Sequence, residues 1–217
     1  MERPSHHSSL FISKDDGDYL YSLESSDSAS HTIVITSATT HVVNPAAGTM
    51  SEFSSWGVTP DLKLKPEITG YGGSVYSTLQ NNSYGLLSGT SMSSPYVAGV
   101  AALVIQNMTG SETGAAKQQL AKAMMMSTAV PVIESTTGVA YSPRKQGAGL
   151  VNIDNALASN AYITVDGSPT PKIDLGDDKD KTGVYDLSFN VVNTGDEALT
   201  FEISSTVQTE KVEIQDV

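Results

Sequence analysis

Residues 85–104 of this 217-residue chain are GLLSGTSMSSPYVAGVAALV, and this pattern is the strongest indication of its fold. A glycine-containing turn leads directly into a run of small and apolar residues that ends near Gln106. Pro95 falls in the expected first turn, where a missing N–H costs little because early helical donors have no acceptor. The pattern predicts a helix over residues 91–106, about 24 Å long at ~1.5 Å per residue. Its small residues suit close packing inside a core: Ala98, Gly99, Ala101 and Ala102.

Ser91 lies at the amino end of this predicted helix. Backbone N–H groups at a helix amino end have no intrahelical acceptor, and the helix dipole favours negative charge there. A serine hydroxyl that attacks a carbonyl creates an oxyanion, which needs such donors, including the N–H of Ser91 itself. The residue types alone leave two interpretations open. Ser91 is either a capping serine of a buried helix, which is common, or a catalytic nucleophile.

The letters GTSMSSPYVAG at 89–99 closely resemble the nucleophile motif of the subtilisin-like serine proteases, the subtilases. The resemblance implies that Ser91 is the nucleophile and that Thr90 and Ser91 support the oxyanion site. We expect no cofactor and identify no metal ligand in this sequence. Tyr96 stands where this family more usually has histidine, and we interpret it as a packing variation. Four further stretches continue the resemblance: FSSWG at 53–57, KPEI at 65–68, MMSTA at 125–129 and QGAGLVN at 146–152.

Together these motifs cover residues 37–160. The resemblance therefore implies an α/β fold class, with residues 37–160 forming the C-terminal part of a three-layer subtilisin-like catalytic domain. Within it, the sequence predicts a glycine-rich loop at 70–73, a strand over 74–78 and a second helix over 115–126. That helix has Leu120, Ala123 and Met124 on one face, and we expect its methionines to fill core gaps rather than bind metal.

Residues 12–20, ISKDDGDYL, resemble the closing part of a protease-associated (PA) domain. Cell-envelope subtilases of the lactocepin and C5a-peptidase type carry that domain before the serine segment. We therefore expect residues 1–36 to be the tail of a PA-type inserted domain. Asp15 and Asp16 are expected in a turn, followed by a short helix over 18–23 and a strand over 31–36.

A complete catalytic triad within this chain is the alternative. The letters at 15–17 faintly echo the Asp-x-Gly motif of subtilases, and His31 and His41 are the candidate bases in the family's order. Neither histidine has the neighbouring glycine of the family's motif, and too few residues precede Ser91 to hold half of an α/β domain. We therefore expect the triad Asp and His outside this chain. Asn44 is expected to be a turn residue rather than an oxyanion donor.

Acidic residues outnumber basic ones 24 to 12, for a formal net charge of −12. Such a surface repels nucleic acid and anionic membranes, so neither is an expected partner. The chain has no cysteine, which excludes disulfides and thiolate metal sites. It has no apolar run long enough to span a membrane, and residues 1–7 do not begin a signal peptide. An export signal, if there is one, is expected outside the chain.

The composition changes after Ser159. Pro169 and Pro171 mark a connector, and the charged loop at 174–181 is expected to be a solvated turn. It only partly imitates a calcium loop, because Phe189 stands where the closing acid should be. Apolar residues alternate over 187–191 and 199–203 around a turn at 193–196, which predicts an antiparallel hairpin with one buried face. Its position resembles that of the fibronectin-III-like domain of cell-envelope subtilases, so residues 161–217 are expected to begin such a β-sandwich.

These observations predict a fragment of a serine-type endopeptidase that acts on polypeptides, located outside the cell or on a bacterial surface. The fragment is expected to need the missing N-terminal half of its catalytic domain and to be inactive alone. The alternative is a non-catalytic remnant or a surface adhesion fragment, in which the helix serves only as scaffold.

Overall fold

The computed structural model describes residues 14–26, 46–108, 110–175 and 178–208. They belong to two units, residues 1–43 and residues 44–217. The predicted strand at 31–36, both candidate histidines and Asn44 lie outside the described residues. No helix of the described residues is long and apolar enough to cross a bilayer.

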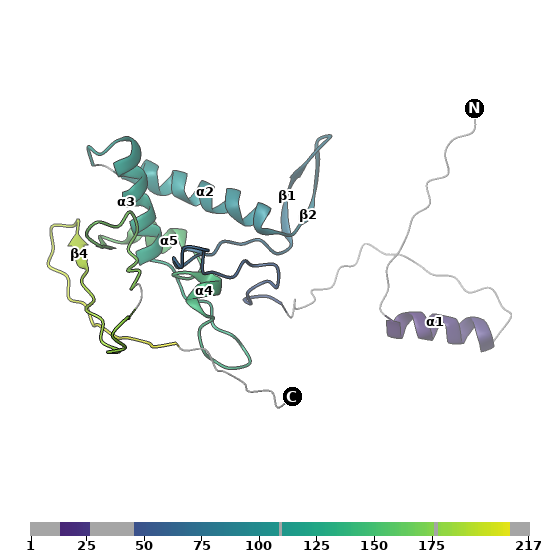
Figure 1. Ribbon diagram of the computed structural model, residues 1–217. Helices are drawn as coiled ribbons and strands as arrows, with labels where there is room; N and C mark the ends of the chain where they lie inside the picture. Colours follow the sequence, from purple (N-terminus) through teal and green to yellow (C-terminus); the bar gives the residue numbers. More distant parts are fainter. Residues whose placement is uncertain (1–13, 27–45, 109, 176–177, 209–217) are drawn as a thin grey trace. The chain divides into compact units, whose positions relative to one another are not determined.

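In the first unit the described residues form helix α1, Lys14–Ser26 (Figure 1). The prediction that Asp15 and Asp16 form a turn before a helix at 18–23 was wrong, because the helix already begins at Lys14. Lys14 forms an ion pair with Asp18 one turn later, which supports this longer helix. Gly17 is tolerated inside it, since an internal glycine costs only about 1 kcal/mol.

The described residues of the second unit form four helices: α2 (Thr90–Asn107), α3 (Gly114–Ser127), α4 (Pro143–Gln146) and α5 (Ile153–Ala158). Helices α2, α3 and α5 pack against one another (Figure 1). Both predicted long helices are confirmed to within one residue at each end. The prediction that methionines of the second helix fill the core is confirmed for Met124 and Met125, which are buried there. The buried core consists of Val100, Val104, Ala121, Met124, Met125, Val151 and Ala156.

Helix α2 differs from the prediction in two respects. Only one of its faces is covered: Val104 is 2% exposed, whereas the neighbouring Leu103 is 46% exposed. Ala98, Gly99 and Ala102 share the uncovered face with Leu103. Pro95 lies at the sixth helical residue rather than in the first turn, so the carbonyl of Ser91 lacks its usual amide donor four residues later.

The predicted strand at 74–78 is confirmed as β1, Val75–Leu79. It pairs antiparallel with β2, Ser83–Leu87, and this hairpin stands next to the amino end of α2 (Figure 1). The turn between the strands contains Asn81 and Asn82 with φ of 59° and 54°. Asparagine tolerates this left-handed backbone well, and such turns suit tight hairpins.

The predicted hairpin of 187–191 with 199–203 was wrong. Residues 190–193 do form a strand, β4, but its antiparallel partner is β3, Ala161–Thr164. Residues 199–203 form no strand, and Phe201 and Ile203 are 53% and 82% exposed. Alternation predicts that a segment can be extended, but it does not specify the partner strand. Here β3 supplies it, while Ile163 in β3 also donates its amide to Ser127 of α3.

In the described part of the charged loop, residues 178–181 form the predicted solvated turn. The carboxylate of Asp178 accepts the amides of Thr182 and Gly183 at 3.1 and 2.7 Å. These amides lower the pKa of the Asp178 carboxyl, Gly183 most and Thr182 next, because both donate to its charged form.

Candidate active site

Ser91 is the second residue of α2, and its side chain is exposed rather than packed in the core. The helix begins after Gly89, whose φ of 150° lies in a region that L side chains rarely adopt. Because glycine has no Cβ, it makes the sharp entry that places Thr90 and Ser91 on the first turn. Thr90 and Ser91, which are expected to support the oxyanion site, therefore lie next to each other at the amino end of α2.

The backbone donors of this turn divide into two pairs. The amides of Met92 and Ser93 both donate to the carbonyl of Gly89, at 3.0 and 3.3 Å. Within the described residues, the amides of Thr90 and Ser91 have no hydrogen-bond acceptor. Donors at a helix amino end, aided by the helix dipole, favour a developing negative charge. The first turn of α2 can thus stabilise an oxyanion beside the Ser91 hydroxyl.

The glycine-rich segment 70–73 holds this turn in place, a role that the sequence analysis did not assign to it. The hydroxyl of Ser93 donates to the carbonyl of Gly70 at 2.9 Å, and the amide of Gly89 donates to the carbonyl of Gly72 at 2.8 Å. A Cβ on Gly70 would lie 2.5 Å from a methyl group of Val97, and one on Gly72 would lie 2.8 Å from the oxygen of Gly89. Glycine is needed at both positions because the backbone approaches α2 so closely.

Residues 146–151 pair with the residues just before this segment: the amide of Ala148 donates to the carbonyl of Glu67 at 3.0 Å. The amides of Thr69 and Val151 donate to the carbonyls of Gly149 and Thr69, at 2.8 and 2.9 Å. The Gln146 side chain is buried, and it accepts the amide of Val132 at 2.7 Å and donates to the carbonyl of Tyr141. Two motifs far apart in the sequence, 65–68 and 146–152, are thus joined by backbone pairing. The sequence shows both motifs but not that they pair.

Tyr96 packs as the sequence analysis interpreted it. Its ring meets that of Tyr71 edge-on, with 5.3 Å between the centroids, and it also contacts the core. Burial raises the pKa of the Tyr96 hydroxyl, with a further contribution from Tyr71. The Tyr96 hydroxyl therefore stays neutral near pH 7, as expected of a side chain whose role is packing.

A surface cavity of about 430 Å³ is lined by residues 55–59 and 65–68. Ser91 does not line it, so this cavity is separate from the candidate nucleophile.

The sequence profile of the subtilase family matches residues 11–149, which is more than half of the chain. The chain belongs to the subtilase family. Its fold class is therefore the subtilisin-like α/β fold, and the predicted family is confirmed.

Curated relatives of this subtilase chain are themselves named as proteases. The C5a peptidase of Streptococcus pyogenes serotype M3 is 37% identical over 211 residues, which cover 94% of this chain and 17% of that protein. The PI-type proteinase of Lactococcus lactis subsp. cremoris is 34% identical over 177 residues, 75% of this chain and 9% of that protein. The chain thus spans about a sixth or less of the length of these relatives.

Among solved structures, the prenylagaramide maturation protease PagA matches with a TM-score of 0.39 and 27% identity, covering 49% of this chain and 36% of that one. The CspB protease of Clostridium perfringens matches with a TM-score of 0.39 and 25% identity, covering 50% of this chain and 23% of that one.

Proposed function

We propose that this subtilase chain carries the nucleophile half of a serine-type endopeptidase, with Ser91 as the nucleophile. The observation that carries the proposal is an exposed serine beside amides without acceptors on the first turn of α2. Membership in a family of serine peptidases supports the same assignment. In the proposed reaction the Ser91 oxygen attacks a peptide carbonyl, the amine leaves, and water releases the acyl group.

The amides of Thr90 and Ser91 are the proposed donors to the oxyanion of the tetrahedral intermediate. A donor of this kind is typically worth about 10²–10³ in kcat. The oxyanion therefore depends on these two amides and on groups supplied from elsewhere in the enzyme.

The triad Asp and His are proposed to come from polypeptide outside these 217 residues. The uncovered face of α2 supports this proposal. A helix that is apolar on all sides is normally covered on all sides, yet Leu103 and its neighbours face solvent. The missing N-terminal half of the catalytic domain is the proposed occupant of that face. In subtilisin itself, loss of the triad Ser or His lowers turnover by about 10⁶. We therefore expect no useful activity from the chain alone.

The protein is proposed to act on polypeptides outside the cell or at a bacterial surface. This follows from its resemblance to cell-envelope subtilases and from the protease names of its relatives. The same resemblance supports residues 1–36 as the tail of a PA-type domain and residues 161–217 as the beginning of a fibronectin-III-like sandwich.

A fluorophosphonate probe tests the nucleophile directly. The 217-residue chain is treated with the probe alone and after co-expression with the N-terminal half of a subtilase catalytic domain encoded upstream. We expect labelling of the Ser91 peptide only in the complemented protein. Ser91→Ala should abolish labelling, whereas Ser94→Ala, an exposed serine of the same turn, should leave it unchanged. Absence of labelling in the complemented wild-type protein would contradict the proposal and favour the non-catalytic alternative.

A further inference from the structure

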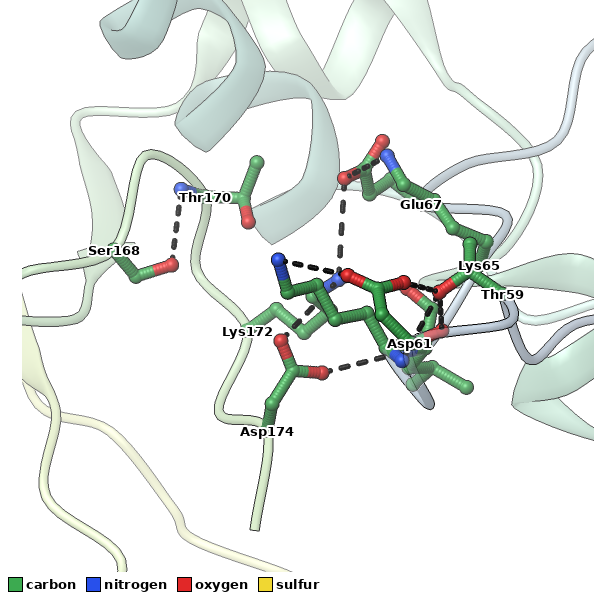
Figure 2. A network of polar contacts seen from close by, with 10 residues as sticks. Thr59, Asp61, Lys65, Glu67, Ser168, Thr170, Lys172 and Asp174 are labelled. Carbon is green, nitrogen blue, oxygen red and sulfur yellow. Dashed lines mark hydrogen bonds and ion pairs between the residues drawn. The ribbon is translucent and has the colours of Figure 1, made fainter. Parts of the chain in front are cut away.

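Lys172 has an unusual environment for a lysine. Its side chain is only 13% exposed, and its ammonium group donates to the carbonyl of Leu64 at 2.6 Å. Two carboxylates face it, Asp174 at 3.8 Å and Glu67 at 4.0 Å (Figure 2). A buried charge is tolerated only where it is paired and hydrogen-bonded, and Lys172 meets both conditions.

The two acidic partners connect Lys172 to the same short segment. Asp174 accepts the amide of Leu64 at 3.2 Å, so both backbone polar groups of Leu64 are bound by side chains from residues 172–174. Glu67 also pairs with Lys65 at 2.5 Å. The network therefore ties residues 64–67 to a segment more than a hundred residues later in the chain (Figure 2).

Residues 67–72, which follow this network in the sequence, connect it by hydrogen bonds to the turn that carries Ser91. The carbonyl of Glu67 accepts the amide of Ala148 at 3.0 Å, and Thr69 is paired on both sides with residues 149–151. Gly70 then accepts the Ser93 hydroxyl, and Gly72 accepts the amide of Gly89. The path from Leu64 to Gly72 is at most about 29 Å long. It is held along its length, and its last residue, Gly72, accepts the amide of Gly89, which lies two residues before Ser91.

We propose that Lys172 is a positioning residue for Ser91, an inference that rests on the proposed function. By fixing Leu64 and Glu67, Lys172 holds the segment 64–72, and this segment fixes the entry into α2 through Gly89. Lys172 lies beyond the residues 11–149 that match the family profile, so the family motifs do not include it. The connector after the motifs thus helps to order the active-site turn.

Amide hydrogen exchange on the 217-residue chain tests the coupling without any need for activity. In Lys172→Met, exchange at the amides of Leu64, Ala148 and Gly89 should rise by about tenfold, while the amide of Thr128 at the end of α3 should not change. Lys122→Met, at an exposed lysine of α3, should change none of the four. Lys172→Arg should restore most of the protection, because it keeps the cation.

Two results would overturn the coupling. One is faster exchange confined to Leu64, which would make the effect local. The other is an equal rise at all four amides, which would mean a general loss of stability. Glu67→Gln serves as a milder variant should Lys172→Met unfold. This variant should accelerate hydrogen exchange at the amides of Ala148 and Gly89 by a smaller factor. Unchanged exchange at both amides would also overturn the proposal.

The functional consequence is measured in the complemented protein. We expect Lys172→Met to lower the rate of Ser91 labelling by the fluorophosphonate, and kcat for a peptide, by about tenfold at an unchanged KM. Labelling at the wild-type rate would overturn the positioning role. If wild-type Ser91 itself is never labelled, the proposed function falls and the positioning role falls with it, whatever hydrogen exchange shows.

Discussion

The segments 65–72 and 146–151 differ from the segment 184–203 in how their backbones are used. The first two are joined to each other by backbone hydrogen bonds of 2.8–3.0 Å, and the first accepts the amide of Gly89, just before α2, at 2.8 Å. In the third, paired strand structure is confined to residues 190–193, and Val184, Leu187 and Phe201 are more than half exposed. Yet the third segment has the more regular apolar alternation. Backbone hydrogen bonding, rather than the pattern of apolar residues, distinguishes segments 65–72 and 146–151 from segment 184–203.

The difference shows what each sequence signal specifies. A glycine such as Gly147 allows another backbone segment to approach closely, since a Cβ there would lie 2.3 Å from the backbone of Glu67. Such a glycine therefore indicates a specific contact. Alternating apolar residues fit any sheet that offers an edge, so they leave the partner open. A glycine at a close approach thus indicates which segments are in contact, whereas apolar alternation indicates only that a segment is extended.

The largest expected effect comes from breaking the glycine contact. Gly147→Ala places its Cβ against the Glu67 backbone at a φ of 66°, and should destabilise the second unit by about 3 kcal/mol. Gly138→Ala is the matched control: its φ is 69°, but no atom lies within 4 Å, so about 1 kcal/mol is expected. Urea unfolding measures both. Equal costs would mean that the contact with residues 67–68 does not hold in solution.

The next largest effect is the difference in stability cost between substitutions on the covered and the uncovered face of α2. Val104→Ala removes a side chain that is 2% exposed, and should cost about 2 kcal/mol. Leu103→Ala removes a larger side chain that is 46% exposed, and should cost about 0.5 kcal/mol in the chain alone. Thermal unfolding with and without the proposed N-terminal half sharpens the comparison. Leu103→Ala should become costly only in the complemented protein, and an unchanged cost there would argue against docking on this face.

The segment 199–203 should tolerate substitution. Phe201→Ser changes a side chain that is 53% exposed, and the free energy of unfolding should change by less than about 0.5 kcal/mol. Val151→Ala in the interlocked region, 3% exposed, should cost about 2 kcal/mol in the same experiment. A similar loss from both variants would show that residues 199–203 pack as a strand after all.

The smallest effect is expected at the turn closed by Asp178. Amides of Gly183 and Thr182 lower the pKa of its carboxyl, so the turn's stabilisation is present above the ordinary aspartate pKa. It is lost as the pH falls through the lowered value. An NMR titration should show the Asp178 carboxyl and the Gly183 amide changing together, with a midpoint below that of an ordinary aspartate. Asp178→Asn should remove this transition at Gly183, and its persistence in the variant would exclude Asp178 as the cause.

Much of the candidate site could be predicted from sequence because its determinants are local. Gly89, the small residues after it and the run to Gln106 set the helix and place Ser91 at its amino end. The second helix follows equally from local periodicity. The β2 strand was missed although Asn81-Asn82 marks its turn, since the alternation of β2 is weak. The roles of Gly70 and Lys172 could not be predicted, because each acts through a partner distant in sequence: Ser93 and Val97 for the glycine, Leu64 and Glu67 for the lysine.

The subtilase family, the two long helices and the position of Ser91 could be predicted without a structure, because propensity, glycine placement and motif letters are properties of neighbouring residues. The folded chain was needed to show that residues 65–72 pair with 146–151, that β4 pairs with β3, and that Lys172 reaches Leu64. Pairing depends on which backbones lie within hydrogen-bond distance after the chain has folded. These distances depend on how segments far apart in the sequence pack together, and not on any one segment.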